Sequence, residues 1–309
     1  MGYKYQKNLI MKLQKFFQNP NNYRKAFSFV EIAVVILIVA VTLIGVMQGR
    51  ELYLKMRLNS ARLLTDRAPI DLINDLSIWV ESTSERSFEN KSLVNSDKIS
   101  KWVNLKTEPE AKFDFSQATV NSQPVYYENA INGLPAVRFN NAQTLQMTST
   151  EISNFISSNE VTIFMVQQSY VGDTTTSSFG WNNGGYRLLT HTGGGAIYFD
   201  FGVCCPASGR TSTASIVGFL NSNNIITFYK NFSNVKIRHN AIEKANSTVA
   251  TSSIPDNLTG VFTLGKYPPD NAYFFLGHIG EFIVFRRALN DSEIDLVEKY
   301  LSEKWAIAI

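Results

Sequence analysis

The stretch Lys-Ala-Phe-Ser-Phe-Val-Glu (residues 25–31), followed by an apolar run from Ile32 to Met47, decides how the rest of the chain must be organised. Between Phe27 and Met47 the only charged residue is Glu31. As a helix this segment is about 31 Å long at about 1.5 Å per residue, which matches the ~30 Å hydrocarbon core of a bilayer. The run is therefore predicted to span a membrane.

The carboxylate of Glu31 is unusual in such a run, because an acid at the bilayer centre costs on the order of 2.5–3.5 kcal/mol and usually has a partner. Two basic residues, a small residue, an aromatic residue and a Glu at the fifth position of an apolar helix resemble the processing site of type IV prepilins and pseudopilins. The resemblance implies that a prepilin peptidase cuts between Ala26 and Phe27, and that the new N-terminus is methylated. It also implies that Glu31 serves assembly with other pilin subunits in inner-membrane lipid.

Two positions depart from the prepilin pattern. Ala26 stands where that family usually has Gly, and Gln48 stands where its helix often has a Pro, so we expect slower processing and no Pro kink. The alternative is an ordinary signal anchor in which Glu31 is incidental. A cleaved secretory signal fits less well, because the apolar core is too long and no small-x-small site follows it.

Charge is distributed unevenly along the chain. The formal net charge is +3, but residues 1–26 contain only basic charged residues, and their removal leaves an acidic remainder. We therefore expect no nucleic-acid partner. Basic residues flank the apolar run about equally, so they leave its orientation open. The prepilin resemblance implies a cytoplasmic leader and a single pass through the bacterial inner membrane, with the head periplasmic or extracellular, or displayed in a surface filament.

Good helix formers continue beyond the apolar run as far as Arg67, and Ala68-Pro69 should end the helix. An apolar stripe with spacings of four, three and four residues is formed by Leu52, Met56, Asn59 and Leu63. We expect one helix of about 40 residues, about 60 Å long, whose outer half packs on a head domain or on neighbouring subunits. The expected domains are a leader over 1–26, a membrane and assembly helix over 27–68, and a head over 69–309.

The residue pattern of the head is that of a β protein. Short runs rich in β-branched and aromatic residues predict strands at 162–166, 196–201, 225–229, 235–239 and 274–285, and the third and fourth of these read as a hairpin. Many short strands over about 240 residues indicate a sandwich with a substantial core. The predicted fold class is α+β: a long N-terminal transmembrane helix, an antiparallel β-sandwich and a short C-terminal helix.

Several short sequence segments of the head are similar to those of bacterial laminin-G-like, concanavalin-A-like jelly rolls. They are the segments 76–79, 102–104, 124–126, 132–139, 279–285, 287–289 and 304–305, in that order. Where that family often has Asp after the first Trp and a Ser-Gly-Asn-Gly turn after the second, this chain has Val80-Glu81 and the segment 105–108. We therefore expect neither a calcium site nor that family's standard glycan pocket, and we expect no metal and no cofactor.

The only cysteines, Cys204 and Cys205, are adjacent, so the chain has no disulfide framework. Two reduced thiols, a vicinal disulfide, and inter-subunit or metal chemistry remain open, in that order of preference.

The most tempting catalytic pattern is Glu-Ile-Asp-Leu-Val-Glu (residues 293–298), which fits the Glu-x-Asp-x-x-Glu signature of glycosidases that use a jelly roll. N-cap candidates precede it, and Ile294, Val297, Leu301 and Trp305 trace a helical stripe, so we predict a capped helix with solvent-facing acids. The three histidines, His191, His239 and His278, lie far apart and lack hydrolase motifs. We expect no catalytic residues.

Exposed aromatic residues bind glycans by stacking, and the best candidates are Trp181 and Tyr186, at the Asn/Gly-rich loop 180–185. The alternative is that both fill the core. Together these features predict a pilin-like structural subunit of a type IV pilus or type II secretion pseudopilus, with an interaction head for a surface glycan or protein. The first alternative is a membrane-anchored lectin-like adhesin that does not polymerise, and the second is a glycoside hydrolase.

Overall fold

The computed structural model describes residues 28–106, 113–140, 142–170, 176–203, 209–249, 253–268 and 273–309. The chain divides into two compact units, Met1–Tyr53 and Leu54–Ile309. The predicted cleavage position between Ala26 and Phe27 and the Cys204-Cys205 pair lie outside the described residues.

The long helix α2 (Phe29–Asp66) matches the predicted helix closely. Two local hydrogen bonds mark its start: Val30 N donates to Ser28 Oγ at 3.3 Å, and Ser28 N donates to Glu31 Oε2 at 2.8 Å. Its apolar part has a mean hydropathy of 2.9 and no buried residue, so it is long and apolar enough to cross a membrane. The 3-10 turn η1 (Pro69–Leu72) follows it, as the Pro requires.

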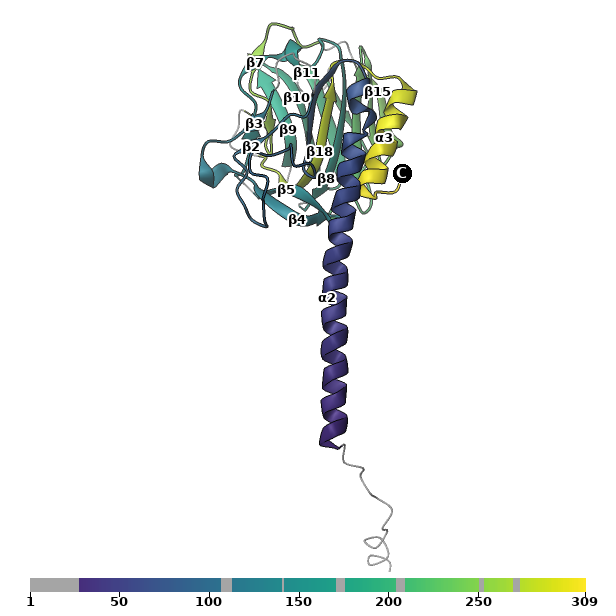
Figure 1. The fold of residues 1–309 in the computed structure, drawn as a ribbon. Coiled ribbons are helices and arrows are strands. Elements are labelled where there is room, and N and C mark those ends of the chain that lie inside the picture. The colour runs from purple at the N-terminus through teal and green to yellow at the C-terminus, as the bar shows by residue number, and fades with distance from the viewer. Residues whose placement is uncertain are drawn as a thin grey trace, which may run out of the picture. The chain divides into compact units, whose positions relative to one another are not determined.

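The rest of the described chain forms an antiparallel β-sandwich (Figure 1). Sheet A has eight strands, which are, in spatial order, β15 (Ile242–Thr248), β14 (Asn234–His239), β13 (Asn224–Asn231), β8 (Glu160–Ser169), β18 (Leu276–Phe285), β5 (Leu134–Asn140) and β4 (Val125–Ile131), with β1 (Leu76–Glu81) beside β18. Sheet B also has eight, which are β12 (Arg210–Ser212), β11 (Ala196–Val203), β10 (Tyr186–Gly193), β9 (Thr176–Asn183), β17 (Thr263–Leu264), β6 (Leu145–Gln146), β3 (Phe115–Ser116) and β2 (Lys101–Trp102). Smaller elements are η2 (Val120–Ser122), η3 (Ile152–Asn154), and the paired β7 (Thr150–Glu151) and β16 (Thr259–Gly260). The predicted fold class is confirmed.

Two-residue turns with positive φ set the strand registers. The β4–β5 hairpin turns at Asn132-Gly133, with φ of 48° and 82°, and the β9–β10 hairpin turns at Gly184-Gly185, with φ of 57° and 92°. Such turns match the right-handed twist of paired strands. The predicted hairpin at 225–239 is also present, as β13 and β14 joined by Phe232-Ser233.

The core between the two sheets is dominated by aromatic side chains. Phe179 stacks on Phe262 with ring centroids 5.8 Å apart, and Phe199 and Phe228 bring the two sheets together at 5.0 Å. These rings are fully buried, so each contributes a large apolar area to the core.

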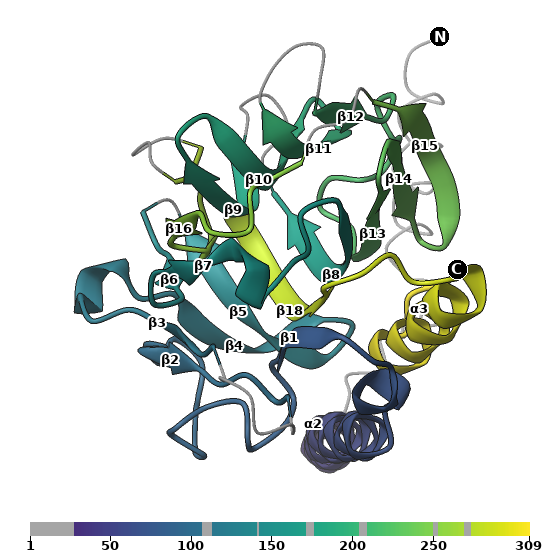
Figure 2. The same ribbon diagram turned by 90° about the horizontal axis from the view of Figure 1, so that it is seen from above.

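The helix α3 (Asp291–Trp305) lies beside sheet A (Figure 2), and a second apolar cluster fills the space between them. Phe164 and Ile283 of the sheet pack there against Ile294, Leu301 and Trp305 of the helix. Gly280 of β18 makes room for the Trp305 ring, because a Cβ on Gly280 would lie only 2.6 Å from that ring. The last turns of α2 join this cluster through Ala61.

The apolar side chains of the stripe predicted on α2 are exposed. Leu52, Met56 and Leu63 are 61%, 61% and 56% exposed, whereas Ala61 and Thr65 are buried. Besides Ala61 and Thr65, the contact with the sandwich uses Leu64 and the guanidinium groups of Arg57 and Arg62, which donate to Asn132 O and Thr83 O. The head unit accordingly begins at Leu54, within the predicted helix domain.

Candidate functional site

The structure places the two predicted ligand-stacking aromatics in a strand hairpin. Trp181 lies in β9, is 0% exposed and belongs to the core, so its predicted exposure is wrong. The Asn/Gly-rich segment is a tight hairpin rather than a loop, and strand alternation turns Trp181 inward. Tyr186, at the start of β10, is half-buried and packs against the core; ligand binding by Tyr186 stays a prediction.

The acids of the glycosidase-like pattern lie on α3, as the helical interpretation predicted. Asn290 and Glu293 form a capping box, and Arg287 binds Glu293 through two hydrogen bonds of 2.8 and 2.6 Å. The expectation that these acids face solvent is wrong for Glu298, which is buried and accepts hydrogen bonds from Thr227 at 2.6 Å and Arg238 at 2.7 Å. Its role is to fasten α3 to sheet A.

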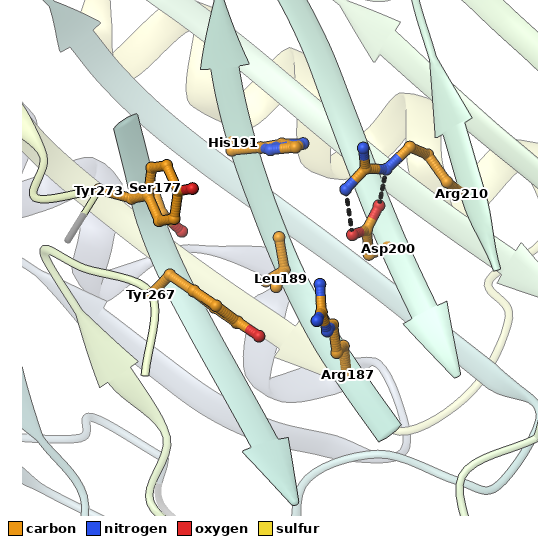
Figure 3. Close-up of a pocket in the computed structure, with 8 residues that line it drawn as sticks. All are labelled: Ser177, Arg187, Leu189, His191, Asp200, Arg210, Tyr267 and Tyr273. Atoms are coloured by element: carbon orange, nitrogen blue, oxygen red, sulfur yellow. Dashed lines mark hydrogen bonds and ion pairs between the residues drawn. The ribbon is translucent and has the colours of Figure 1, made fainter. Parts of the chain in front are cut away.

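The structure reveals a pocket that the sequence did not indicate, on the outer face of sheet B (Figure 3). Its volume is about 250 Å³. Four strands and one loop provide its lining, which consists of Ser177, Arg187, Leu189, His191, Asp200, Arg210, Tyr267 and Tyr273.

Strand alternation explains why these residues face outward. In β10, Leu188 points into the core, so Arg187, Leu189 and His191 point the other way. In β11, Phe199 and Phe201 belong to the core and Asp200 faces the pocket. The β9–β10 ladder has a register shift between Thr190 and Thr192, beside His191. Such bulges re-aim side chains and are common next to functional sites.

Asp200 and Arg210 form the polar wall of the pocket. They are directly paired residues of β11 and β12, and Arg210 donates from Nε to Oδ1 at 2.6 Å and from Nη2 to Oδ2 at 2.7 Å. Asp200 is 1% exposed. The hydrogen bond to Asp200 raises the pKa of Arg210 and outweighs its partial burial. A bidentate pair of this kind holds both groups in a fixed plane.

His191 lies between this pair and the aromatic wall. Burial lowers the pKa of His191 to about 4, so the imidazole is neutral near pH 7. Its ring meets the edge of Tyr198 at 4.5 Å. Within the described part of the chain its Nε2 atom is buried without a hydrogen-bond partner. A buried polar atom of this kind normally has a partner, so the site is polar and incomplete.

Tyr267 and Tyr273 form the opposite wall. Their ring centroids are 6.3 Å apart, and Arg187 lies over the Tyr267 ring at 5.4 Å. Tyr273 is 45% exposed and has a φ of 58°, a conformation that a bulky residue rarely adopts. Ser177 N holds it by donating to Tyr273 O at 2.9 Å.

Ser177, His191 and Asp200 are the residue types of a hydrolytic triad, but they are not connected as one. The Ser177 hydroxyl lies 2.6 Å from Thr190 O and 2.9 Å from Phe179 O, toward the main chain. Both oxygens of Asp200 are engaged by Arg210. Nucleophilic catalysis needs a hydroxyl bonded to a base that is itself oriented by an acid. The arrangement instead suits the binding of a polar ligand.

The described residues contain no group of three His, Cys, Asp or Glu side chains placed to hold a metal ion. The other two histidines lie elsewhere: His239 contacts Asn224, and His278 contacts Tyr170 at 2.7 Å on sheet A. Burial lowers the pKa of both, that of His278 to about 4. The three histidines do not form a site, as their separation in the sequence predicted.

The sequence did carry one signal of the pocket. Arg187, Leu189 and His191 alternate with apolar or small residues in β10, and Asp200 does so in β11. The sequence does not indicate that these strands and the distant Tyr273 meet on the outer face of sheet B.

No protein-family model matches the chain, and no curated protein matches it. Among solved structures, domain 4 of AbnA, a GH43 extracellular arabinanase from Geobacillus stearothermophilus, in complex with arabinotriose, is 16% identical with a TM-score of 0.45, covering 72% of this chain and 98% of that one. The binding domain of Paraclostridial Mosquitocidal Protein 1 is 11% identical with a TM-score of 0.46, covering 74% and 52%. The CBM40 of Ruminococcus gnavus IT-sialidase, bound to alpha2,3 sialyllactose, is 15% identical with a TM-score of 0.40, covering 53% and 95%. These are distant likenesses, and the ligands are those of the other proteins.

Proposed function

We propose that the protein is a pilin-like subunit of a type IV pilus or type II secretion pseudopilus, cut between Ala26 and Phe27, with a binding head. The observation that carries the proposal is the single carboxylate of Glu31 in the first turn of an otherwise apolar helix. Its depth, four residues after the proposed new N-terminus, fits a role in assembly.

The exposed apolar stripe of α2 supports the same proposal. Leu52, Met56 and Leu63 stay more than half exposed although the neighbouring Ala61 packs on the head. Large apolar side chains that recur on one helix face and that no described residue covers are typical of an interaction surface. The helix of an adjacent subunit would bury this stripe, since side chains three and four residues apart lie on one helix face.

Glu31 needs a cation once water is excluded from a filament. In the single chain its carboxylate accepts a hydrogen bond from Ser28 N. Cleavage before Phe27 would create an α-ammonium on a neighbouring subunit, and staggered helices would bring it close. A desolvated ion pair adds little net stability, but leaving one charge alone costs several kcal/mol, so the pair selects the register of assembly.

The test is the Glu31→Val variant, expressed beside the parent in cells with a working prepilin system. We expect it to insert in the membrane and be cut, yet to be absent from sheared filaments, while Glu31→Asp keeps part of the incorporation. Mass spectrometry of the N-terminal peptide should find a methylated Phe27. Parent-like incorporation of Glu31→Val, or an intact leader in cells that process other prepilins, would refute the proposal.

A membrane-anchored adhesin that does not polymerise is the second candidate, and the pocket on sheet B favours it equally. The two are separated by fractionation: the adhesin would keep its leader or stay entirely in the membrane. In both cases the head binds a surface glycan or protein and the helix provides the anchor.

A further inference from the structure

We propose that the pocket on the outer face of sheet B binds one uncharged sugar-sized ring through two neighbouring hydroxyl groups. This deepens the proposed function, because it gives the displayed head a ligand and a binding site. The polar wall is the Asp200–Arg210 pair, and the aromatic wall is Tyr267 and Tyr273 (Figure 3).

The charges of the pocket favour an uncharged ligand. The guanidinium of Arg210 is neutralised by Asp200, which it binds through both oxygens. Arg187 lies over the Tyr267 ring and is not a free cation either. An anion would have to approach the buried Asp200 carboxylate, and a cation would have to approach two arginines. An uncharged ligand avoids the cost of desolvating a charge of its own at this site.

The hydrogen-bonding groups match neighbouring hydroxyls. An arginine has five N–H donors and Arg210 uses two of them on Asp200, so donors remain at the pocket beside the carboxylate acceptors. A hydroxyl both donates and accepts, so two adjacent hydroxyls can accept from Arg210 and donate to Asp200. The Nε2 atom of His191, which has no partner among the described residues, adds a third polar contact. A purely apolar ligand would exclude water from Arg210, Asp200 and His191 without replacing its hydrogen bonds.

Shape and aromatic exposure point to a ring. The volume of about 250 Å³ equals the share of about eight water molecules, which suits one six-membered ring with its substituents and not a helix or a folded loop. Tyr273 presents a part-exposed ring that is held in a strained conformation, and Leu189 provides an apolar floor. An apolar ring face on one wall and hydroxyl edges on the other fit these two surfaces.

The experiment titrates the full-length protein, in a detergent without a sugar headgroup, with methyl glucoside, methyl galactoside, methyl mannoside and methyl glucuronide. Calorimetry or saturation-transfer NMR measures the dissociation constants. We expect saturable binding of at least one uncharged glycoside near the millimolar range. Arg210→Lys, which loses the bidentate fork, and Tyr273→Ala should each weaken it at least about tenfold, whereas Tyr273→Phe should retain it.

Arg287→Lys is the matched control, because it disturbs a bidentate arginine–carboxylate pair of the same kind far from the pocket. It should leave the dissociation constant unchanged. The proposal is overturned if no uncharged glycoside binds at about 100 mM, if Arg210→Lys and Tyr273→Ala bind like the parent, or if the glucuronide binds more than about tenfold better than every uncharged glycoside. Glu31→Val should bind normally and Arg210→Lys should still enter filaments, which separates this proposal from the assembly proposal.

Discussion

On the outer face of sheet A, large apolar side chains such as Phe164 and Ile283 are buried under α3, whereas the outer face of sheet B carries Arg187, His191 and Asp200 around a pocket. The two faces belong to one sandwich and share one aromatic core. Sheet A uses its outer face to hold α3 and the last turns of α2, whereas no helix of the described chain packs on the outer face of sheet B. The difference places helix attachment on sheet A and the proposed binding site on sheet B.

Charged groups follow the same division. Under α3, Lys304 lies 2.9 Å from both Glu81 and Glu281, and all three side chains are fully buried. Glu281 also accepts hydrogen bonds from Trp79 at 2.8 Å and Tyr300 at 2.9 Å. On sheet B the buried Asp200 is paired with an Arg210 side chain that is 30% exposed. The three charges under α3 are enclosed, whereas the pair on sheet B includes one part-exposed member, Arg210.

Lys304→Met should produce the largest effect, because it removes the cation shared by two buried carboxylates. Burial alone would raise the pKa of Glu81, but Lys304 and the hydrogen bonds of Thr83 hold it below its usual value. Losing one partner of a buried ion pair costs about 3–5 kcal/mol. Urea unfolding of the full chain, followed by tryptophan fluorescence, measures the loss, since all four tryptophans lie in the head.

The control is Lys299→Met, an exposed lysine of the same helix. It should change the free energy of unfolding by less than about 0.5 kcal/mol. If Lys304→Met lowers the free energy of unfolding as little as Lys299→Met does, the buried ion pairs do not hold α3. The two faces of the sandwich would then not differ in the way described.

Gly280→Ala should have an intermediate effect on the same side of the molecule. The new Cβ would lie 2.6–2.9 Å from three atoms of the Trp305 ring, which is fully buried. Overpacking of this kind costs about 1–3 kcal/mol. Gly49→Ala in α2, where nothing lies within 4 Å, is the control and should not destabilise the head. An unchanged unfolding midpoint for Gly280→Ala would show that α3 packs loosely.

The apolar helix and the sandwich could be predicted because their signals are local. An uninterrupted apolar run fixes α2, and short β-branched runs bounded by turns fix β8, β13 and β14. The capped helix α3 was predicted from Asn290 and its apolar spacing, but burial of Glu298 was not, because that depends on Arg238 from a distant strand.

The pocket and the helix contact depend on tertiary packing that no local pattern encodes. The apolar spacing of Leu52, Met56 and Leu63 predicted a stripe correctly, but the head selected the face of Ala61 instead. Trp181 was misread because a two-glycine turn extends β9 farther than its composition suggests. Asp200 and Tyr273 are 73 positions apart, and only the pairing of strands with a returning loop brings them together.

The smallest expected effect compares one histidine on each face, His191 on sheet B and His278 on sheet A. Burial lowers the pKa of each from 6.5 to about 4; His191 also faces Asp200, Arg210 and Arg187, and His278 faces Arg138. The folded state therefore binds fewer protons than the unfolded state between these values, so stability is highest above pH 6.5 and falls toward pH 4. Each histidine should cost about 1 kcal/mol between about pH 7 and pH 5.5. Unfolding of His191→Gln and His278→Gln at both pH values should show each variant losing about 1 kcal/mol less than the parent. A parent-like pH dependence in His191→Gln would mean that the imidazole on the open face is already solvated, so that only the covered face buries its histidine.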